Sequence, residues 1–220
     1  MKKSTLILAT LLTCAMTTNG FAAQSKPGAY VSGFLGFSNT NSATMETTDF
    51  LATPTATYND RLEFDPGLFI GGTGGYDFGM IRLEGELSYR DAGINKVNSD
   101  RSVDRNLGML AMMINAWFDL ENQTPVTPYL GVGVGFVSLN FDKDYYDRTT
   151  GAPVFYEDHA STYAFQAGGG LELSMTPRFS LDLGYRYFMT GKATFDKYYD
   201  LENKLKVESH NVALGFRTKF

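Results

Sequence analysis

The sequence predicts an all-β fold, an eight-stranded antiparallel barrel that spans a membrane. Three observations predict it: a last strand with regular alternation, seven further stretches of about ten residues with a similar pattern, and connections that alternate between short and long. Beyond the N-terminal segment, no stretch is apolar over the roughly 20 residues that a membrane helix needs. A water-soluble β-sandwich also alternates, so the connections and strand ends must distinguish the two.

The last strand, residues 206–220, has the clearest alternation. One face carries His210, Val212, Leu214, Phe216, Thr218 and Phe220, and the other carries Asn211, Ala213, Gly215, Arg217 and Lys219. The first face suits lipid and the second suits a polar lumen.

The other seven predicted strands are residues 29–37, 68–78, 80–90, 107–118, 129–140, 161–173 and 179–188. The connections at one end are short, at residues 77–79, 121–128 and 174–178. Those at the other end are longer, at residues 39–66, 91–106, 141–160 and 189–205, and we expect loops there. Regular short-long alternation is typical of membrane barrels. In the fifth of these strands, Gly131, Gly133 and Gly135 share one face, and small inward residues leave room for bulky ones in a narrow barrel.

The N-terminus has the order of a signal peptide. Two lysines precede a short apolar stretch and small residues, so we expect residues 1–22 to be a signal peptide with cleavage after Ala22 or Ala23, leaving a domain from residue 23 to 220. Cys14, the single cysteine, suggests lipidation, but the bulky Thr13 before it favours removal with the signal. The mature chain then has no disulfide and no Cys-ligated metal, and we expect no cofactor.

The charge argues against nucleic acid as a partner. The chain has 19 basic and 24 acidic residues, a net charge of −5 that becomes about −7 when Lys2 and Lys3 are removed.

Several segments together resemble a known family. They are Tyr30-Val31-Ser32-Gly33, Gly75-Tyr76-Asp77-Phe78, and residues 82–90, 128–133 and 212–220. They are similar to the opacity-type outer-membrane β-barrels, a surface-antigen superfamily that includes the membrane domain of outer membrane protein A. The resemblance implies a Gram-negative outer membrane rich in lipopolysaccharide, short periplasmic turns and four longer extracellular loops. It also implies that Leu214, Phe216 and Phe220 form the signal read by the barrel assembly machinery.

Strand phase predicts a charged lumen. The inward residues are Arg82, Glu84, Glu86, Arg90, Asn115, Asp119, Gln166, Glu172, Asp182, Arg186, Arg217 and Lys219. They could form a gated ion path or a static plug of salt bridges. We favour the plug, because an eight-stranded barrel is just wide enough for side chains to fill.

Three patterns suggest chemistry, and each has a simpler interpretation. Glu84 and Glu86 resemble an acid-base pair, but a filled lumen excludes substrate. His159 and Ser161 with Glu172 resemble the arrangement of lipid A deacylases, but Ser161 and Glu172 have opposite phases. A cluster of Asp142, Asp144 and Asp147 could bind a divalent cation, although a solvated acidic loop is the simpler interpretation.

Aromatic residues mark the expected outer loops: Tyr145, Tyr146, Phe155, Tyr156, Tyr198 and Tyr199. An interfacial girdle is the simpler interpretation, and the pairs Tyr145-Tyr146 and Tyr198-Tyr199 are the best candidates for contact with a partner.

The function hypothesis is a non-enzymatic surface protein, an adhesin-like display barrel that contributes to the envelope and contacts lipopolysaccharide, a host or a neighbouring cell. The alternatives are a narrow porin-like channel and, more remotely, a lipid A deacylase.

Overall fold

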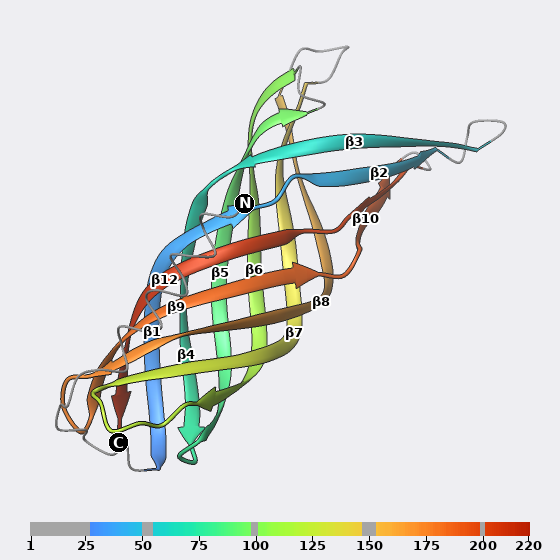
Figure 1. Cartoon of the computed structure of the whole chain (residues 1–220). Coiled ribbons are helices and arrows are strands. Elements are labelled where there is room, and N and C mark those ends of the chain that lie inside the picture. The colour runs from blue at the N-terminus through green and yellow to red at the C-terminus, as the bar shows by residue number, and fades with distance from the viewer. Residues whose placement is uncertain (1–26, 50–54, 98–100, 147–152, 199–200) are drawn as a thin grey trace, which may run out of the picture.

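The computed structural model describes residues 27–49, 55–97, 101–146, 153–198 and 201–220 (Figure 1). Within these ranges, no helix is long and apolar enough to cross a membrane. The strands in them are β1 (Gly28–Thr40), β2 (Ala43–Asp49), β3 (Ala56–Asp65), β4 (Gly67–Asp77), β5 (Ile81–Val97), β6 (Arg101–Asp119), β7 (Val126–Tyr146), β8 (Pro153–Ser174), β9 (Phe179–Thr190), β10 (Ala193–Tyr198), β11 (Leu201–Leu205) and β12 (Glu208–Lys219).

Eight of these strands close into an antiparallel barrel, which confirms the predicted fold class. Their order around the wall is β1, β4, β5, β6, β7, β8, β9 and β12, and β12 pairs again with β1. In the closing register Leu35 lies between Leu214 on β12 and Ile70 on β4. Because closure pairs both edges of each barrel strand, the backbone groups of the wall need no water.

The connections at one end of the barrel are short, where the sequence predicts them. Between β4 and β5 the Phe78 N–H donates to the Ile81 carbonyl oxygen over 2.9 Å. Gly79 in this turn has a φ of 106°, a left-handed conformation that favours glycine, and its N–H donates to Asp77 Oδ1 over 2.7 Å. We call the opposite end of the barrel the outer end.

The segments at the outer end contain strands instead of the loops expected from the sequence. Residues 39–66 hold the whole of β2 and β3, and residues 189–205 hold β10 and β11. The β5–β6 and β7–β8 hairpins extend well beyond their predicted ends. Two antiparallel strands can continue to pair beyond the membrane as long as they stay in register. In water neither face of the paired strands has to be apolar. The lipid-facing alternation therefore could not reveal these strands.

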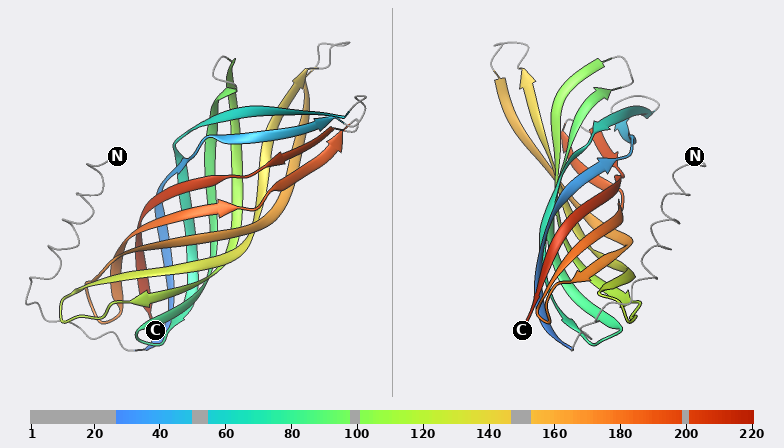
Figure 2. Two further views of the ribbon diagram at one scale, coloured as in Figure 1. Left: turned by 45° about the vertical axis from the view of Figure 1, so that its right-hand side comes forward. Right: turned by 60° about the vertical axis from the view of Figure 1, so that its left-hand side comes forward.

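Four of the outer strands extend the barrel sheet beyond the closed wall, and we call this four-stranded part the outer sheet. Its order is β10, β11, β2 and β3, and β3 joins it to barrel strand β5. The right-hand view of Figure 2 shows the outer sheet and the long β7–β8 hairpin leaving the outer end as separate arms. Near the base of β10, the Gly191 N–H donates to the Tyr163 carbonyl of β8 over 2.9 Å.

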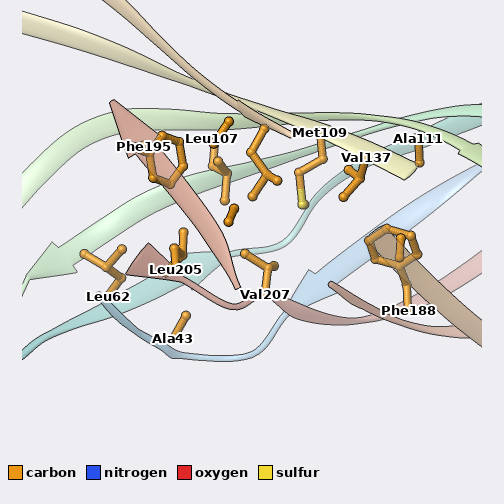
Figure 3. Packing of buried hydrophobic residues seen from close by; sticks show 14 of the residues in the cluster. Ala43, Leu62, Leu107, Met109, Ala111, Val137, Phe188, Phe195, Leu205 and Val207 are labelled. Atoms are coloured by element: carbon orange, nitrogen blue, oxygen red, sulfur yellow. The ribbon is translucent and has the colours of Figure 1, made fainter. Parts of the chain in front are cut away.

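A hydrophobic cluster fills the interior beneath the outer sheet (Figure 3). The outer sheet contributes Ala43, Leu62, Ala193, Phe195 and Leu205, and Val207 follows it. Strands β5 to β9 contribute Ile94, Leu107, Met109, Ala111, Met113, Val137, Leu139, Ala160, Ala164 and Phe188. This apolar packing fixes the outer sheet over the lumen.

The outer wall of the barrel is apolar. In β12, Val212 is 49%, Leu214 68% and Phe216 50% exposed, whereas Ala213 on the other face is buried. The predicted phase of this strand is therefore confirmed. Exposed apolar residues recur on the other barrel strands, including Leu35, Ile70, Leu87, Ile114, Val134, Phe165 and Leu183.

Aromatic side chains flank this apolar wall. At the short-turn end, the ring centroids of Tyr76 and Phe78 lie 4.7 Å apart. Toward the outer end, His210 lies beside Tyr187 with ring centroids 5.2 Å apart, and its Nδ1 is 2.7 Å from the Tyr185 hydroxyl. Paired aromatic zones of this kind mark the two interfaces of a membrane.

Candidate functional site

Alternate positions of the barrel strands bring a polar network into the lumen. The buried members are Arg82, Glu84, Glu86, Arg90, Asn115, Asp119, Gln166, Glu172, Arg186 and Arg217, while Asp182 and Lys219 are half-buried. Removing so many charges from water is costly unless each is paired, so the contacts between them determine what the lumen can do.

A first group lies near the short turns. Arg82 donates from Nη2 to Asp119 Oδ1 over 2.7 Å, and its Nε lies 2.6 Å from Asp119 Oδ2. Glu172 is bonded by Ser180 Oγ over 2.6 Å and by Arg217 Nη1. The Arg82 Nη1 atom also lies 3.9 Å from Glu172, so the group is continuous. At the same end, Lys219 pairs with Asp77.

A second group surrounds Glu84. Its carboxylate accepts hydrogen bonds from the Tyr30 hydroxyl and the Trp117 indole, each over 2.7 Å, and from Asn115 over 3.1 Å. Neutral donors thus satisfy this charge without water.

Glu86 extends the second group toward the outer end. It accepts from Asn115 Nδ2 and Gln166 Nε2, both over 2.9 Å, and lies 3.5 Å from Arg186 and 3.8 Å from Arg90. Glu84 is therefore held by neutral donors, and Glu86 by neutral donors and two arginines, which makes both carboxylates unsuited to acid-base chemistry on a substrate.

An aromatic layer covers the outer side of this network. The Arg90 guanidinium lies between the rings of Phe69 and Phe188, 4.4 and 4.1 Å from their centroids. Arg186 lies 4.3 Å from the centroid of Phe34. Cation–π contacts are stronger where water is excluded, so this layer links the polar network to the hydrophobic cluster above it.

Inward glycines make room for the bulky lumen residues, as expected. A Cβ on Gly131 would come within 2.5 Å of Trp117 Cε3, and one on Gly170 within 2.5 Å of the Tyr129 hydroxyl. Tyr30, Trp117 and Tyr129 also contact the polar network, although they were not among the predicted lumen residues. The alternation of their strands could have identified them, because all three lie at inward positions.

The hydrolase-like arrangement does not assemble. His159 and Ser161 lie exposed on β8, and His159 Nδ1 is 2.6 Å from Asn140 Oδ1. Glu172 is buried in the lumen near the opposite end of the same strand, with Arg217 and Ser180 as its partners. The three residues thus cannot act on one substrate.

Several residues singled out from the sequence lie wholly or partly outside the described residues. Tyr145 and Tyr146 end β7 and Tyr198 ends β10, but only their backbones are described. The same holds for Asp142 and Asp144 of β7 and for Phe155 and Tyr156 of β8. Asp147, Tyr199 and the signal-peptide residues 1–22 with Cys14 lie outside the described residues altogether.

The residues of the expected assembly signal share one face of β12 and its end. Leu214 and Phe216 point outward, and Phe220 is 79% exposed. The Phe220 N–H donates to the Ala29 carbonyl over 3.0 Å, which ties the last residue to the start of β1.

Comparison with known proteins gives a consistent result. Residues 6–220 match the family described as outer membrane protein beta-barrel domain. The outer membrane protein PagN of Salmonella typhimurium is 28% identical over 193 residues, which cover 80% of each chain.

Two solved structures share the fold. OprG, an outer membrane protein of Pseudomonas aeruginosa, superposes with a TM-score of 0.63 at 13% identity and covers 90% of this chain and 99% of its own. Neisserial surface protein A superposes with a TM-score of 0.52 at 21% identity and covers 89% of this chain and 100% of its own.

Proposed function

This chain belongs to the outer-membrane protein β-barrel family of Gram-negative bacteria, and we propose that within that family it is a non-enzymatic, adhesin-like surface protein. Its barrel lies in the lipid and lipopolysaccharide of the outer membrane and contributes to the envelope. Its outer strands contact a ligand on a host or a neighbouring cell.

The observation that carries this proposal is the filling of the lumen by two packed layers. The polar network crosses the membrane part, and the hydrophobic cluster under the outer sheet lies above it. Ions need a hydrated path, and an eight-stranded barrel filled with side chains offers little room for one. This packing favours display over the narrow channel that is the alternative.

The outer sheet and the β7–β8 hairpin form the proposed display surface. Strands that continue the barrel ladders hold surface residues more rigidly than free loops, which lowers the entropy lost on binding. The hairpin ladder runs out to the pair Tyr146 and Pro153. Tyr145, Tyr146, Tyr198 and Tyr199 are the proposed contact residues, because tyrosine provides a large and fairly rigid contact area.

Absence of catalysis is part of the proposal. The carboxylates Glu84 and Glu86 are held inside the lumen, and the separation of Ser161 from Glu172 argues against a hydrolase triad. Lipid A from cells with and without the protein should therefore have the same mass spectrum.

A trimmed hairpin tests the display function. Phe141 and Asp158 face each other in register, so residues 142–157 can be replaced by an Asn-Gly turn without disturbing the ladder below. Intact cells that express this variant should lose the binding to host or neighbouring cells that the full protein confers. The variant should still migrate differently in detergent gels before and after boiling, because the barrel is unchanged.

Point variants distinguish the loss of tyrosine contacts from the effect of shortening the hairpin. Replacing Tyr145, Tyr146, Tyr198 and Tyr199 together by Ser should reduce cell binding. The matched control is Tyr76→Ser, which removes another exposed tyrosine, 45% exposed on β4 at the short-turn end, far from the display surface, and should leave binding unchanged. Full binding by both the trimmed and the serine variants would contradict the proposal.

A further inference from the structure

A small cavity lies in the lumen where separate parts of the polar network meet. Its volume is about 20 Å³, and its lining includes Arg82 and Arg217 of the first group, Glu84 and Arg186 of the second, and Asp182. Asp182 belongs to neither group through a hydrogen bond: its Oδ1 accepts from the Tyr129 hydroxyl over 3.0 Å.

Polar atoms of these residues lack a hydrogen-bond partner within the described part of the chain. The donors are Arg82 Nη1, Arg186 Nη1 and Arg217 Nε, and the acceptor is Asp182 Oδ2. The three arginines are 0%, 9% and 5% exposed, respectively. Arg82 Nη1 and Arg186 Nη1 keep longer ion-pair contacts, at 3.9 Å to Glu172 and 3.5 Å to Glu86. A buried polar atom without a hydrogen bond is destabilising, so the concentration of such atoms around one cavity requires an explanation.

We propose that the cavity is a binding site for a water molecule that is part of the folded protein. A site needs about 10–15 Å³ and two to four polar partners to hold one water, and this cavity meets both conditions. The water oxygen accepts hydrogen bonds from arginine N–H groups, and one water O–H donates to Asp182 Oδ2.

The chemistry of the lining selects water over an ion. A halide could accept from the arginines but could not donate to the Asp182 carboxylate, which would repel it. A metal cation would face the three guanidinium groups that line the same cavity. Water alone among these ligands both donates and accepts.

The water connects the parts of the network. The first group runs from Asp119 through Arg82 and Glu172 to Arg217, and the second joins Glu84, Glu86 and Arg186. A water bonded to Asp182 Oδ2 and to arginines of both groups brings Asp182 into the network and adds a hydrogen-bonded link between the two groups. Asp182 then acts as a positioning residue for the water. This role is independent of the proposed display surface and of its ligand.

A crystal structure at high resolution tests the site directly. The expected result is one discrete density peak within hydrogen-bond distance of Asp182 Oδ2 and of at least one arginine donor from each group. Crystals grown in sodium bromide should show no anomalous peak there. Either an anomalous bromide signal at this position or a cavity without density would overturn the proposal.

Two variants check the role of Asp182. Asp182→Asn is nearly the same size and can present its amide oxygen to the water, so its structure should retain the density peak. Asp182→Leu removes the acceptor and should lose the peak. If Asp182→Leu does not refold, the wild-type experiment still decides. A peak of equal strength in the Leu variant would contradict the assignment of Asp182 as the residue that holds the water.

Discussion

Ala213 and Leu214 are consecutive in β12 and lie on opposite sides of the barrel wall, with Ala213 7% and Leu214 68% exposed. Leu214 therefore faces hydrocarbon in the membrane, while Ala213 packs with Phe34 and Phe69 inside. Because side chains alternate along a strand, these two residues determine which residues of β12 face lipid and which face the lumen.

Leu214→Arg should destabilise the folded barrel by about 2–4 kcal/mol, the cost of a basic side chain facing the lipid near the bilayer midplane. Leu214→Ala, which removes the same side chain without adding a charge, should cost clearly less. Denaturant unfolding in lipid vesicles measures both. Equal costs for the two variants would show that Leu214 does not face hydrocarbon.

The Arg82–Asp119 pair should show strong coupling. Asp119→Ala leaves a buried guanidinium whose nearest remaining carboxylate is that of Glu172, 3.9 Å away, so a loss of about 3–5 kcal/mol is expected. Arg82→Met with Asp119→Ala should cost less than the sum of the two single changes, because neither charge is then stranded. A double-mutant cycle on refolded protein measures this. Additive single effects would mean that the ion pair contributes nothing.

Strand phase alone predicted which side chains enter the lumen, as Arg82 and Glu84 illustrate. In a membrane barrel one face of each strand meets lipid and the other meets the interior, so a period of two assigns both faces. The same phase places Tyr30 and Trp117 inside, but it does not identify Glu84 as their common acceptor. That contact depends on how side chains from several neighbouring strands meet inside the barrel, which the period of two within one strand does not give.

The outer sheet and the hydrophobic cluster were beyond the reach of the sequence pattern. Ala43 and Leu62 come from one predicted loop and Phe195 and Leu205 from another, far apart in the sequence. The segments bury apolar side chains together only because β11 pairs with β2. Without that pairing, each segment shows an irregular mixture of polar and apolar residues that resembles a loop.

Phe195→Ala should weaken the packing of the outer sheet on the hydrophobic cluster and leave the eight-stranded barrel folded. The side chain is 1% exposed in the hydrophobic cluster, and deletion of a buried phenylalanine ring costs about 3–5 kcal/mol. The outer sheet should become sensitive to protease while the barrel keeps its heat-dependent shift in gels. Thr194→Ala, on the exposed face of the same strand, is the control. Protease resistance equal to wild type in both variants would argue against the cluster as the support of the outer sheet.

Deletion of Phe220 should impair assembly in cells more than folded stability. Its side chain is 79% exposed, so few contacts within the barrel depend on it, whereas the proposed assembly signal requires it. Cell fractionation should find precursor or degraded protein in the periplasm, and denaturant unfolding of refolded protein should give nearly the wild-type stability. Normal insertion of the deletion variant in cells would contradict the proposed signal.

Purified, refolded protein should show no steady conductance in planar bilayers, because the polar network and the hydrophobic cluster both lie across the lumen. Arg186→Gln should remain silent as well: it removes one charge, but Phe34, Phe69 and Phe188 still fill the layer above. A channel would behave differently, since loss of a cation from its narrowest part would change its conductance or ion selectivity. Steady wild-type conductance that changes in Arg186→Gln, together with full cell binding by the trimmed hairpin variant, would replace display by transport as the function of this barrel.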